Sequence, residues 1–263
     1  GDYRGMVTFR AANAASSQLK FLLKVLPFTL ARPAKRTWGL YADSARWQHY
    51  SDAELERELR DIRAHGIDAL HLSPLAHGTL RYAEGRLTVD FTPLSRLMAV
   101  CRRVGLRGPI VLDVQEVAGV IAKLRGGKPD DAETQRLAVV ALSELAVRAA
   151  AEKWPPHYFH ILDQADLRSP GAVASTQALL QALKQAGLSL SATAVDPQRV
   201  PAAIEPFLDA CCYSLGFVLD GQSEALTTRL RASGKPFWCY GSGCYTFGRG
   251  EEGNIALNRY LAG

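Results

Sequence analysis

A short apolar stretch of the chain ends abruptly in an acid and an amide. It runs from His157 through Tyr-Phe-His-Ile-Leu to Asp163 and Gln164, with a further acid at Asp166. Buried strands that end in polar side chains at the mouth of an α/β fold are where such proteins place their chemistry. Carbohydrate chemistry would suit this position, although hydrolysis of a sugar ordinarily uses two carboxyl groups. We assign Asp163 and Gln164 as the candidate catalytic residues.

Polar and aromatic residues also follow the other predicted strands. Acids in such places commonly cap the next helix, but Asp43 and Asp113 stop apolar runs without an adjacent turn pair, which favours a site. Tyr240 and Tyr245 bracket a Gly-Ser-Gly turn and offer flat faces on which sugar rings stack. The candidate substrate-binding residues are Asp43, His77, Asp113, Glu116, Asp166, Tyr240 and Tyr245.

Several other chemistries lack their motifs. The chain has no G-x-x-x-x-G-K-[ST] phosphate loop, no H-E-x-x-H and no G-x-S-x-G. His157 and His160 are three apart on a predicted strand, so their side chains face opposite sides and cannot share a metal ion. Single core or loop histidines are the preferred interpretation, with His71 or His77 able to hydrogen-bond a ligand. We expect no metal and no cofactor.

The five cysteines form neither a disulfide framework nor a zinc motif, because their number is odd and no C-x-x-C pair occurs. Buried thiols are the preferred interpretation. A bridge from Cys211 or Cys212 to Cys239 stays open if their strands are neighbours.

Composition bounds the class of protein. The 263 residues are 48% hydrophobic, enough for one barrel or two small domains. The net charge of +5 lies in residues 1–37, and the rest is near neutral without a basic stripe, so a nucleic-acid partner is not expected. No apolar run approaches the ~20 residues of a membrane span. Gly1 suggests a boundary within a longer protein, and the oligomeric state stays open.

The periodicity divides the chain near residue 36. Residues 1–36 read as an N-terminal β-segment, because Leu19, Phe21 and Leu23 alternate with lysines, as in a strand with one wet face. Residues 37–263 alternate strand and helix, with a polar excursion or a small hairpin around Glu84-Gly85 at 75–90. The predicted strands are 38–42, 67–72, 109–114, 158–162, 188–195, 211–218 and 237–240.

Seven strands with intervening helices favour parallel pairing through right-handed crossovers. We predict an α/β fold, a (β/α)8 TIM barrel that is incomplete at its C-terminus or closed by an N-terminal strand, preceded by a short β-segment. A doubly wound open sheet is the alternative, although no glycine-rich dinucleotide turn follows any strand.

In this order, several motifs resemble barrels of the glycoside hydrolase family 123 type. They are Gly39-Leu-Tyr-Ala-Asp43, the helix at 51–66, the strand end at Leu162-Asp163, Tyr240-Gly-Ser-Gly-Cys-Tyr245, Glu252-Gly-Asn254 and Asn258-Arg259. The resemblance covers most of the chain, and Val25-Leu-Pro-Phe-Thr-Leu30 is similar to the end of the β-sandwich that precedes such barrels. It implies a bacterial protein, outside the cell or in the periplasm, that acts on amino-sugar-containing glycans.

Members that cleave N-acetylhexosaminides carry adjacent Asp and Glu after the fourth strand. The resemblance implies a substrate-assisted retaining mechanism, in which the Asp orients the 2-acetamido group and the Glu protonates the leaving oxygen. Asp163 matches the Asp, but Gln164 stands at the Glu position, and an amide cannot supply a proton near neutral pH.

Three explanations of Gln164 stay open: an introduced Glu→Gln change, a natural non-catalytic sugar-binding barrel, or an acid supplied by Asp166, Asp113 or Glu116. The corresponding hypotheses for the whole chain are an N-acetylhexosaminidase-like glycosidase, a carbohydrate-binding barrel without turnover, and a structural barrel without a glycan site.

Overall fold

The computed structural model describes residues 1–25, 27, 37–42, 44–163, 170–194, 204–214, 228 and 232–240. The chain divides into two compact units, Gly1–Arg36 and Thr37–Gly263. In chain order the elements are β1 (Asp2–Ala11), β2 (Ala14–Lys24), β3 (Gly39–Tyr41), η1 (Ser44–His49), α1 (Asp52–Ala64), β4 (Ala69–Leu72), η2 (Pro74–His77), β5 (Thr79–Ala83), β6 (Arg86–Asp90), α2 (Thr92–Val104), β7 (Ile110–Asp113), α3 (Val117–Arg125), α4 (Ala132–Ala151), β8 (His157–Asp163), α5 (Pro170–Gln185), β9 (Leu190–Ala194), η4 (Glu205–Phe207), β10 (Ala210–Ser214) and β11 (Phe237–Tyr240).

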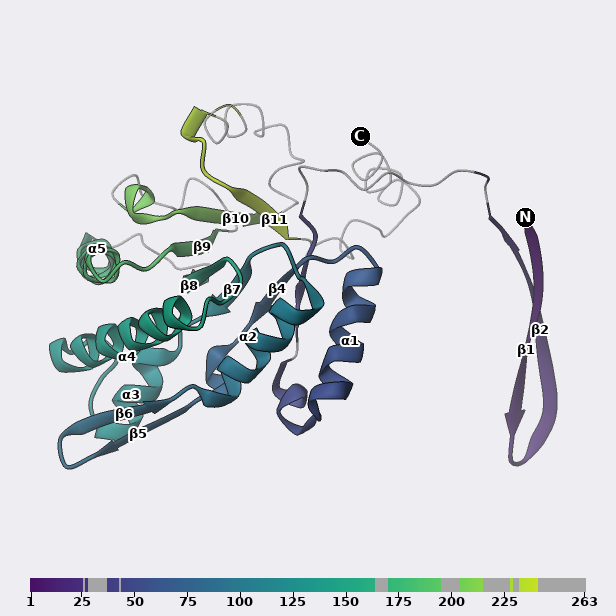
Figure 1. Cartoon of the computed structure of the whole chain (residues 1–263), viewed down its shortest axis with the longest axis horizontal. Coiled ribbons are helices and arrows are strands. Elements are labelled where there is room, and N and C mark those ends of the chain that lie inside the picture. The colour runs from purple at the N-terminus through teal and green to yellow at the C-terminus, as the bar shows by residue number, and fades with distance from the viewer. Residues whose placement is uncertain are drawn as a thin grey trace. The chain divides into compact units, whose positions relative to one another are not determined.

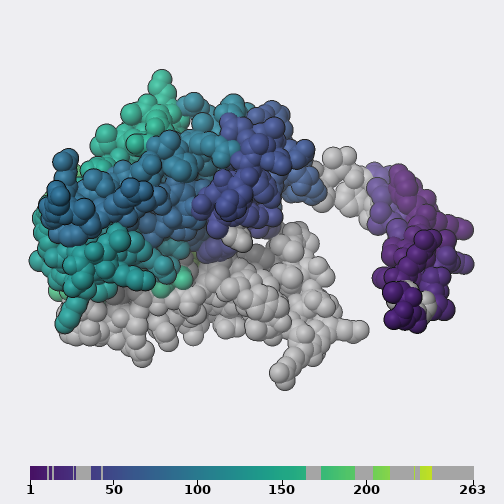
Figure 2. Space-filling view, turned by 90° about the horizontal axis from the view of Figure 1, so that it is seen from below, coloured from purple at the N-terminus to yellow at the C-terminus, as the bar shows by residue number. Residues whose placement is uncertain are grey.

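The first unit contains the antiparallel hairpin β1–β2, drawn in purple as a thin body in Figure 2. The register pairs Tyr3 with Leu23 and Val7 with Leu19, which gathers large apolar side chains on one exposed face. Arg4 and Lys20 lie at alternate positions and therefore on the other face. The predicted extended structure is confirmed, whereas both faces of the hairpin are exposed, including Met6 and Leu22 on the face of Lys20.

The second unit is built on one seven-stranded sheet in the order β11-β10-β9-β8-β7-β4-β3. Every neighbouring pair is parallel, so all seven carboxyl ends meet at one edge. Figure 1 shows the sheet curled, with helices α1, α2, α4 and α5 arranged around its outside. A doubly wound sheet would carry helices on both faces. The fold is therefore α/β with a parallel half-barrel.

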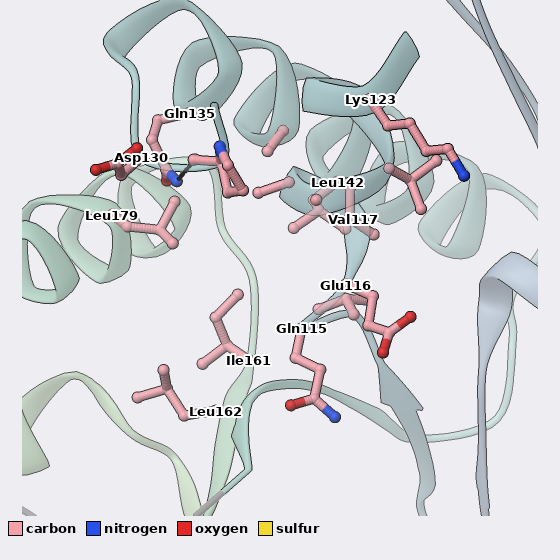
Figure 3. A pocket seen from close by; sticks show the side chains of 16 residues that line it. Gln115, Glu116, Val117, Lys123, Asp130, Gln135, Leu142, Ile161, Leu162 and Leu179 are labelled. Atoms are coloured by element: carbon pink, nitrogen blue, oxygen red, sulfur yellow. Dashed lines mark hydrogen bonds between the residues drawn. The ribbon is translucent and has the colours of Figure 1, made fainter. Parts of the chain in front are cut away.

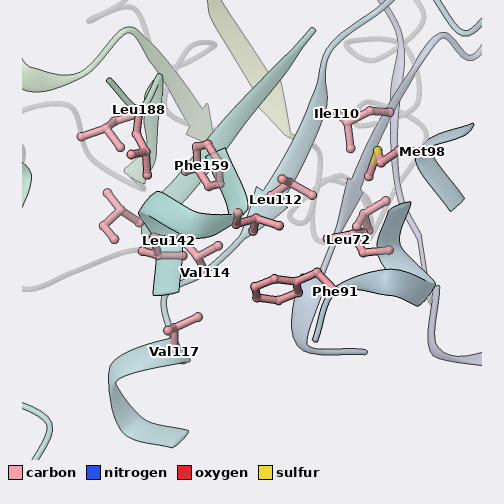
Figure 4. Packing of buried hydrophobic residues seen from close by; sticks show 14 of the residues in the cluster. Leu72, Phe91, Met98, Ile110, Leu112, Val114, Val117, Leu142, Phe159 and Leu188 are labelled. Carbon is pink, nitrogen blue, oxygen red and sulfur yellow. The ribbon is translucent and has the colours of Figure 1, made fainter. Parts of the chain in front are cut away.

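The hydrophobic core lies between the sheet and these helices. Leu72, Ile110, Leu112 and Phe159 point from the strands toward the helical layer, where α2 contributes Met98 (Figure 4). Each of these side chains is at most 2% exposed. Because side chains alternate along a strand, the residues between them, including the polar ones, face the concave side of the sheet.

Local sequence signals account for the ends of several elements. Ser51 caps α1 through a capping box with Glu54, as its sequence predicts. The hairpin β5–β6 turns at Glu84 and Gly85, which both have positive φ angles; such two-residue turns match the twist of the strands. The predicted hairpin within 75–90 is confirmed.

Two further expectations from the sequence concern the cysteines and membrane-spanning helices. Cys101 and Cys211 are buried, as the preferred interpretation predicts, and the alternative of a bridge to Cys239 stays open. Across the ranges described above, no helix combines the length and the apolar character that crossing a membrane requires.

Candidate functional site

Two of the predicted site residues end neighbouring strands. Asp113 is the last residue of β7 and Asp163 is the last residue of β8, and the two strands pair in parallel. Partial loss of hydration, together with the Asp113 carboxylate, raises the pKa of Asp163 above its usual 3.8. The Asp163 side chain is nevertheless exposed at the strand end. A carboxyl group that holds its proton more tightly, beside a second carboxyl group, is suited to proton transfer or to hydrogen bonding with a ligand.

A β-bulge directs Asp163 to the concave side of the sheet. His160 pairs with Ser191 of β9, and Asp163 pairs with Thr193. His160 and Asp163 are three positions apart on β8, but their partners are only two positions apart on β9. Ile161 is the extra residue, and Leu162 pairs with Ala192 on the face that packs against the helices. Without this bulge, alternation would have placed His160 and Asp163 on opposite faces.

Three aromatic rings contact one another on the concave face below these acids. His71 on β4 lies between Tyr41 on β3, with ring centroids 4.3 Å apart, and His160 on β8, at 5.0 Å. His160 is buried and its Nδ1 lies 3.4 Å from the Ser191 hydroxyl. Tyr41, in contrast, is 58% exposed. The cluster therefore extends from the surface of the half-barrel into its interior.

The cluster reaches Asp113 directly. His71 Nε2 lies 3.9 Å from Asp113 Oδ2, a distance too long for a direct hydrogen bond. Burial lowers the pKa of His71 and the Asp113 carboxylate opposes that shift, with burial the larger effect. Asp113 is oriented by Gln115, whose backbone N–H and side-chain amide each donate to it at 3.3 Å. The result is an imidazole with a lowered pKa that faces a carboxyl group oriented by Gln115.

His77 lies apart from this cluster, in a cavity of about 250 Å³ lined by residues of η1, α1, η2 and α2. Its side chain is 4% exposed and its Nε2 has no hydrogen-bond partner among the described residues. Burial lowers the pKa of His77 to about 4, against a hydrogen bond with the Ser44 backbone that raises it. His77 is therefore a neutral buried imidazole, and its predicted contact with substrate stays a prediction.

Glu116 lies beside a second cavity of about 630 Å³, between the β7–α3 loop, α3, α4 and the end of β8. Figure 3 shows Ile161, Leu162, Leu142 and Leu179 as its apolar lining. This cavity is on the helix side of the sheet, as the pairing of Leu162 requires. Asp163 and Glu116 are thus associated with different faces at the edge of the barrel.

Four of the predicted site residues, namely Asp43, Gln164, Asp166 and Tyr245, fall outside the described residues. Tyr240 ends β11, next to β10 at the margin of the sheet. Within the described ranges, no three His, Cys, Asp or Glu side chains are grouped as a metal ion would require. The polar cluster on the concave face can form hydrogen bonds with a ligand.

The aromatic cluster was missed at the level of sequence. His71 and His160 belong to strands separated by β7, and only the curvature of the sheet brings their rings together. The available signal was the regular interruption of apolar runs, in which a polar residue stands at His71 between Leu70 and Leu72. That alternation marks the face, but it does not reveal the contact across strands.

No protein family profile matches the chain, and no curated protein is similar to it in sequence. Among solved structures, a family 123 glycoside hydrolase from Clostridium perfringens is similar over 92% of this chain, with a TM-score of 0.57 and 12% identity. The endo-1,4-β-mannanase from Rhizomucor miehei is similar over 80% of this chain and 78% of its own, with a TM-score of 0.54 and 10% identity. The endo-β-1,4-mannanase from Thermotoga petrophila is similar over 76% of this chain and 59% of its own, with a TM-score of 0.51 and 12% identity.

These likenesses define the fold. The chain has a glycoside hydrolase-like fold, an α/β half-barrel of the TIM type. It spans 50% of the length of the Clostridium perfringens structure. At 10–13% identity the likeness establishes the architecture and leaves the substrate and the reaction to the side chains.

Proposed function

We propose that this chain binds amino-sugar-containing glycans at the carboxyl edge of its half-barrel, with Asp163 contacting the 2-acetamido group. The observation that carries the proposal is that Asp113 and Asp163 end two adjacent parallel strands, at the edge where barrel enzymes place their sites. A carboxyl group accepts the acetamido N–H when ionised and donates to the acetamido oxygen when protonated. Its raised pKa lets Asp163 keep its proton to a higher pH than an ordinary aspartate does.

The surroundings of this pair suit a sugar. Tyr41 presents an exposed aromatic ring on the concave face, and such rings stack on the apolar C–H faces of pyranosides. His71 and Asp113 add hydrogen-bonding groups deeper in the same face. A platform with convergent polar groups is the usual composition of a small-ligand site.

Hydrolysis is the second candidate, and the carboxyl pair favours it. In a substrate-assisted reaction, the acetamido oxygen attacks the anomeric carbon, Asp163 stabilises the acetamido group, and a separate acid protonates the leaving oxygen. The amide of Gln164 cannot be that acid. Asp113 is the described carboxyl group nearest in register to Asp163, so it is our candidate for the missing proton donor.

A binding panel tests the proposal. The Clostridium perfringens enzyme is associated with glycolipid glycans, and two similar barrels are β-1,4-mannanases, so the two ligand classes can be compared directly. We expect saturable calorimetric binding of a terminal N-acetylgalactosaminide oligosaccharide and none of β-1,4-mannotetraose. Binding of mannotetraose alone would reject the amino-sugar assignment, and binding of neither would favour a structural barrel.

A further inference from the structure

The distance between His71 and Asp113 suits a single oxygen atom that bridges them. The 3.9 Å between Nε2 and Oδ2 is too long for a direct hydrogen bond, yet an oxygen placed ~2.8 Å from both atoms would see them at an angle of about 90°. A hydroxyl group can donate to the carboxylate and accept from the imidazole N–H at the same time. A separation of this size between two polar groups is characteristic of a bridging group.

The His71 imidazole is positioned to bind such a bridging hydroxyl group. His71 Nε2 has no hydrogen-bond partner among the described residues, and its side chain is only 14% exposed. Buried polar atoms are rarely left unpaired in a native protein, because each costs free energy. Tyr41 and His160 pack against the ring, so the ring cannot easily rotate away to find another partner.

The carboxylate is held equally well. Gln115 donates to both oxygens of Asp113 through its backbone and its side chain, which fixes the direction of the carboxyl group. The Asp113 side chain is 28% exposed, so a ligand can reach it from solvent. Groups held in advance by surrounding contacts bind with little loss of conformational entropy.

The local charge restricts the class of ligand. Asp113 and Asp163 are both acids, and among the described residues their neighbours on the concave face are Tyr41, His71, His160 and Ser191. None of these carries a fixed positive charge. A phosphorylated or uronic sugar would bring a second anion against these acids, which costs free energy. A neutral sugar avoids that cost.

We propose that His71 and Asp113 together bind one hydroxyl group of a neutral pyranoside and thereby orient the sugar beneath Asp163. The inference rests on the proposed glycan site and adds to it the residues that select the sugar. His71 and Asp113 are positioning residues in this account. Tyr41 supplies the stacking face beside them.

The first test needs no variant of the protein. The affinity of the chain is measured for a methyl N-acetylgalactosaminide and for its 3-, 4- and 6-deoxy analogues. We expect one analogue to bind about 10- to 100-fold more weakly, because a hydrogen bond that involves a charged group is lost. Equal binding of all four sugars would overturn the proposal while leaving the proposed function intact. Failure of the parent sugar to bind would overturn both.

Variants of His71 and Asp113 then test whether these two residues cause the difference in affinity. Each of the variants His71→Leu and Asp113→Ala should lower the affinity for the parent sugar by the factor that the weakly binding deoxy analogue shows. Neither variant should change the affinity for that analogue. His71→Gln, whose amide nitrogen reaches the position of Nε2, should restore part of the loss. His157→Gln is the matched control, because His157 lies on β8 and bonds to Pro155. If these variants lower the affinity for every sugar to the same extent, His71 and Asp113 have a structural role, and the proposal is contradicted.

Discussion

His160 and Asp163 lie on the same face of β8, although three positions separate them. The bulge at Ile161 restores the alternation, so both residues pair with positions of β9 that share a face, Ser191 and Thr193. The carboxyl group of Asp163 therefore stands above the buried histidine rather than among the helices. A bulge that redirects a side chain next to a site is a recurrent feature of sheet proteins.

The identity of residue 164 determines the expected rate of hydrolysis. We predict that Gln164→Glu raises the rate of cleavage of an aryl N-acetylgalactosaminide by about 10²- to 10⁴-fold, since a positioned general acid contributes that much. The release of the aryl alcohol measures it.

Gln181→Glu is the control for that variant, because it makes the same change on the exposed surface of α5. Unchanged cleavage by Gln164→Glu, with native circular dichroism, would argue against a substrate-assisted site at this strand end.

Asp163 is expected to reduce the stability of the fold. Its pKa is raised, so its contribution to stability is present below its unfolded-state value near 3.8 and is lost as the pH rises through the folded-state value. Asp163→Asn should therefore raise Tm slightly at pH 7, as expected where function opposes stability.

Differential scanning calorimetry at pH 7 measures this change. Asp61→Asn, on the exposed surface of α1, should leave Tm unaltered. A Tm for Asp163→Asn at or below that of the unmodified protein would show that Asp163 makes stabilising contacts instead.

Because two histidines are buried, we predict that the protein loses stability in acid. Burial lowers the pKa of His77 to about 4 and that of His160 to about 3. Each contribution to stability is complete above pH 6.5 and is lost as the pH falls toward the folded-state value, because the unfolded chain takes up the proton first. The free energy of unfolding should fall by on the order of 1–2 kcal/mol per histidine between pH 7 and pH 5.

Denaturant titrations at the two pH values, with His77→Leu and His65→Gln, isolate this contribution. His65 is exposed at the end of α1, so His65→Gln should keep the full pH dependence. His77→Leu should lose part of it, and an unchanged dependence would mean that His77 is protonated in the folded protein.

Much of the architecture could be predicted from local signals. Runs of four to eight residues, largely apolar and separated by amphipathic segments, predicted the seven strands of the sheet, and the Ser51–Glu54 capping box predicted the start of α1. Such signals depend only on neighbours within a few residues, which is why the sequence displays them.

The geometry of the site could be predicted only in part. Asp113 and Asp163 were expected at strand ends, and they lie there on adjacent strands. The contact of His71 with Tyr41 and His160 depends on the curvature of the sheet, and the face of Asp163 depends on one bulged residue. Neither property has a signature in the residue types alone.

The affinity difference between an acetamido sugar and its hydroxyl counterpart tests the central claim most directly. Calorimetry would compare a methyl N-acetylgalactosaminide with the matching galactoside, for the unmodified protein and for Asp163→Ala. We predict that the unmodified protein prefers the acetamido sugar by about 10- to 100-fold, and that Asp163→Ala removes this preference while still binding the galactoside. Equal affinity of the unmodified protein for the two sugars, or a preference that survives in Asp163→Ala, would contradict the account.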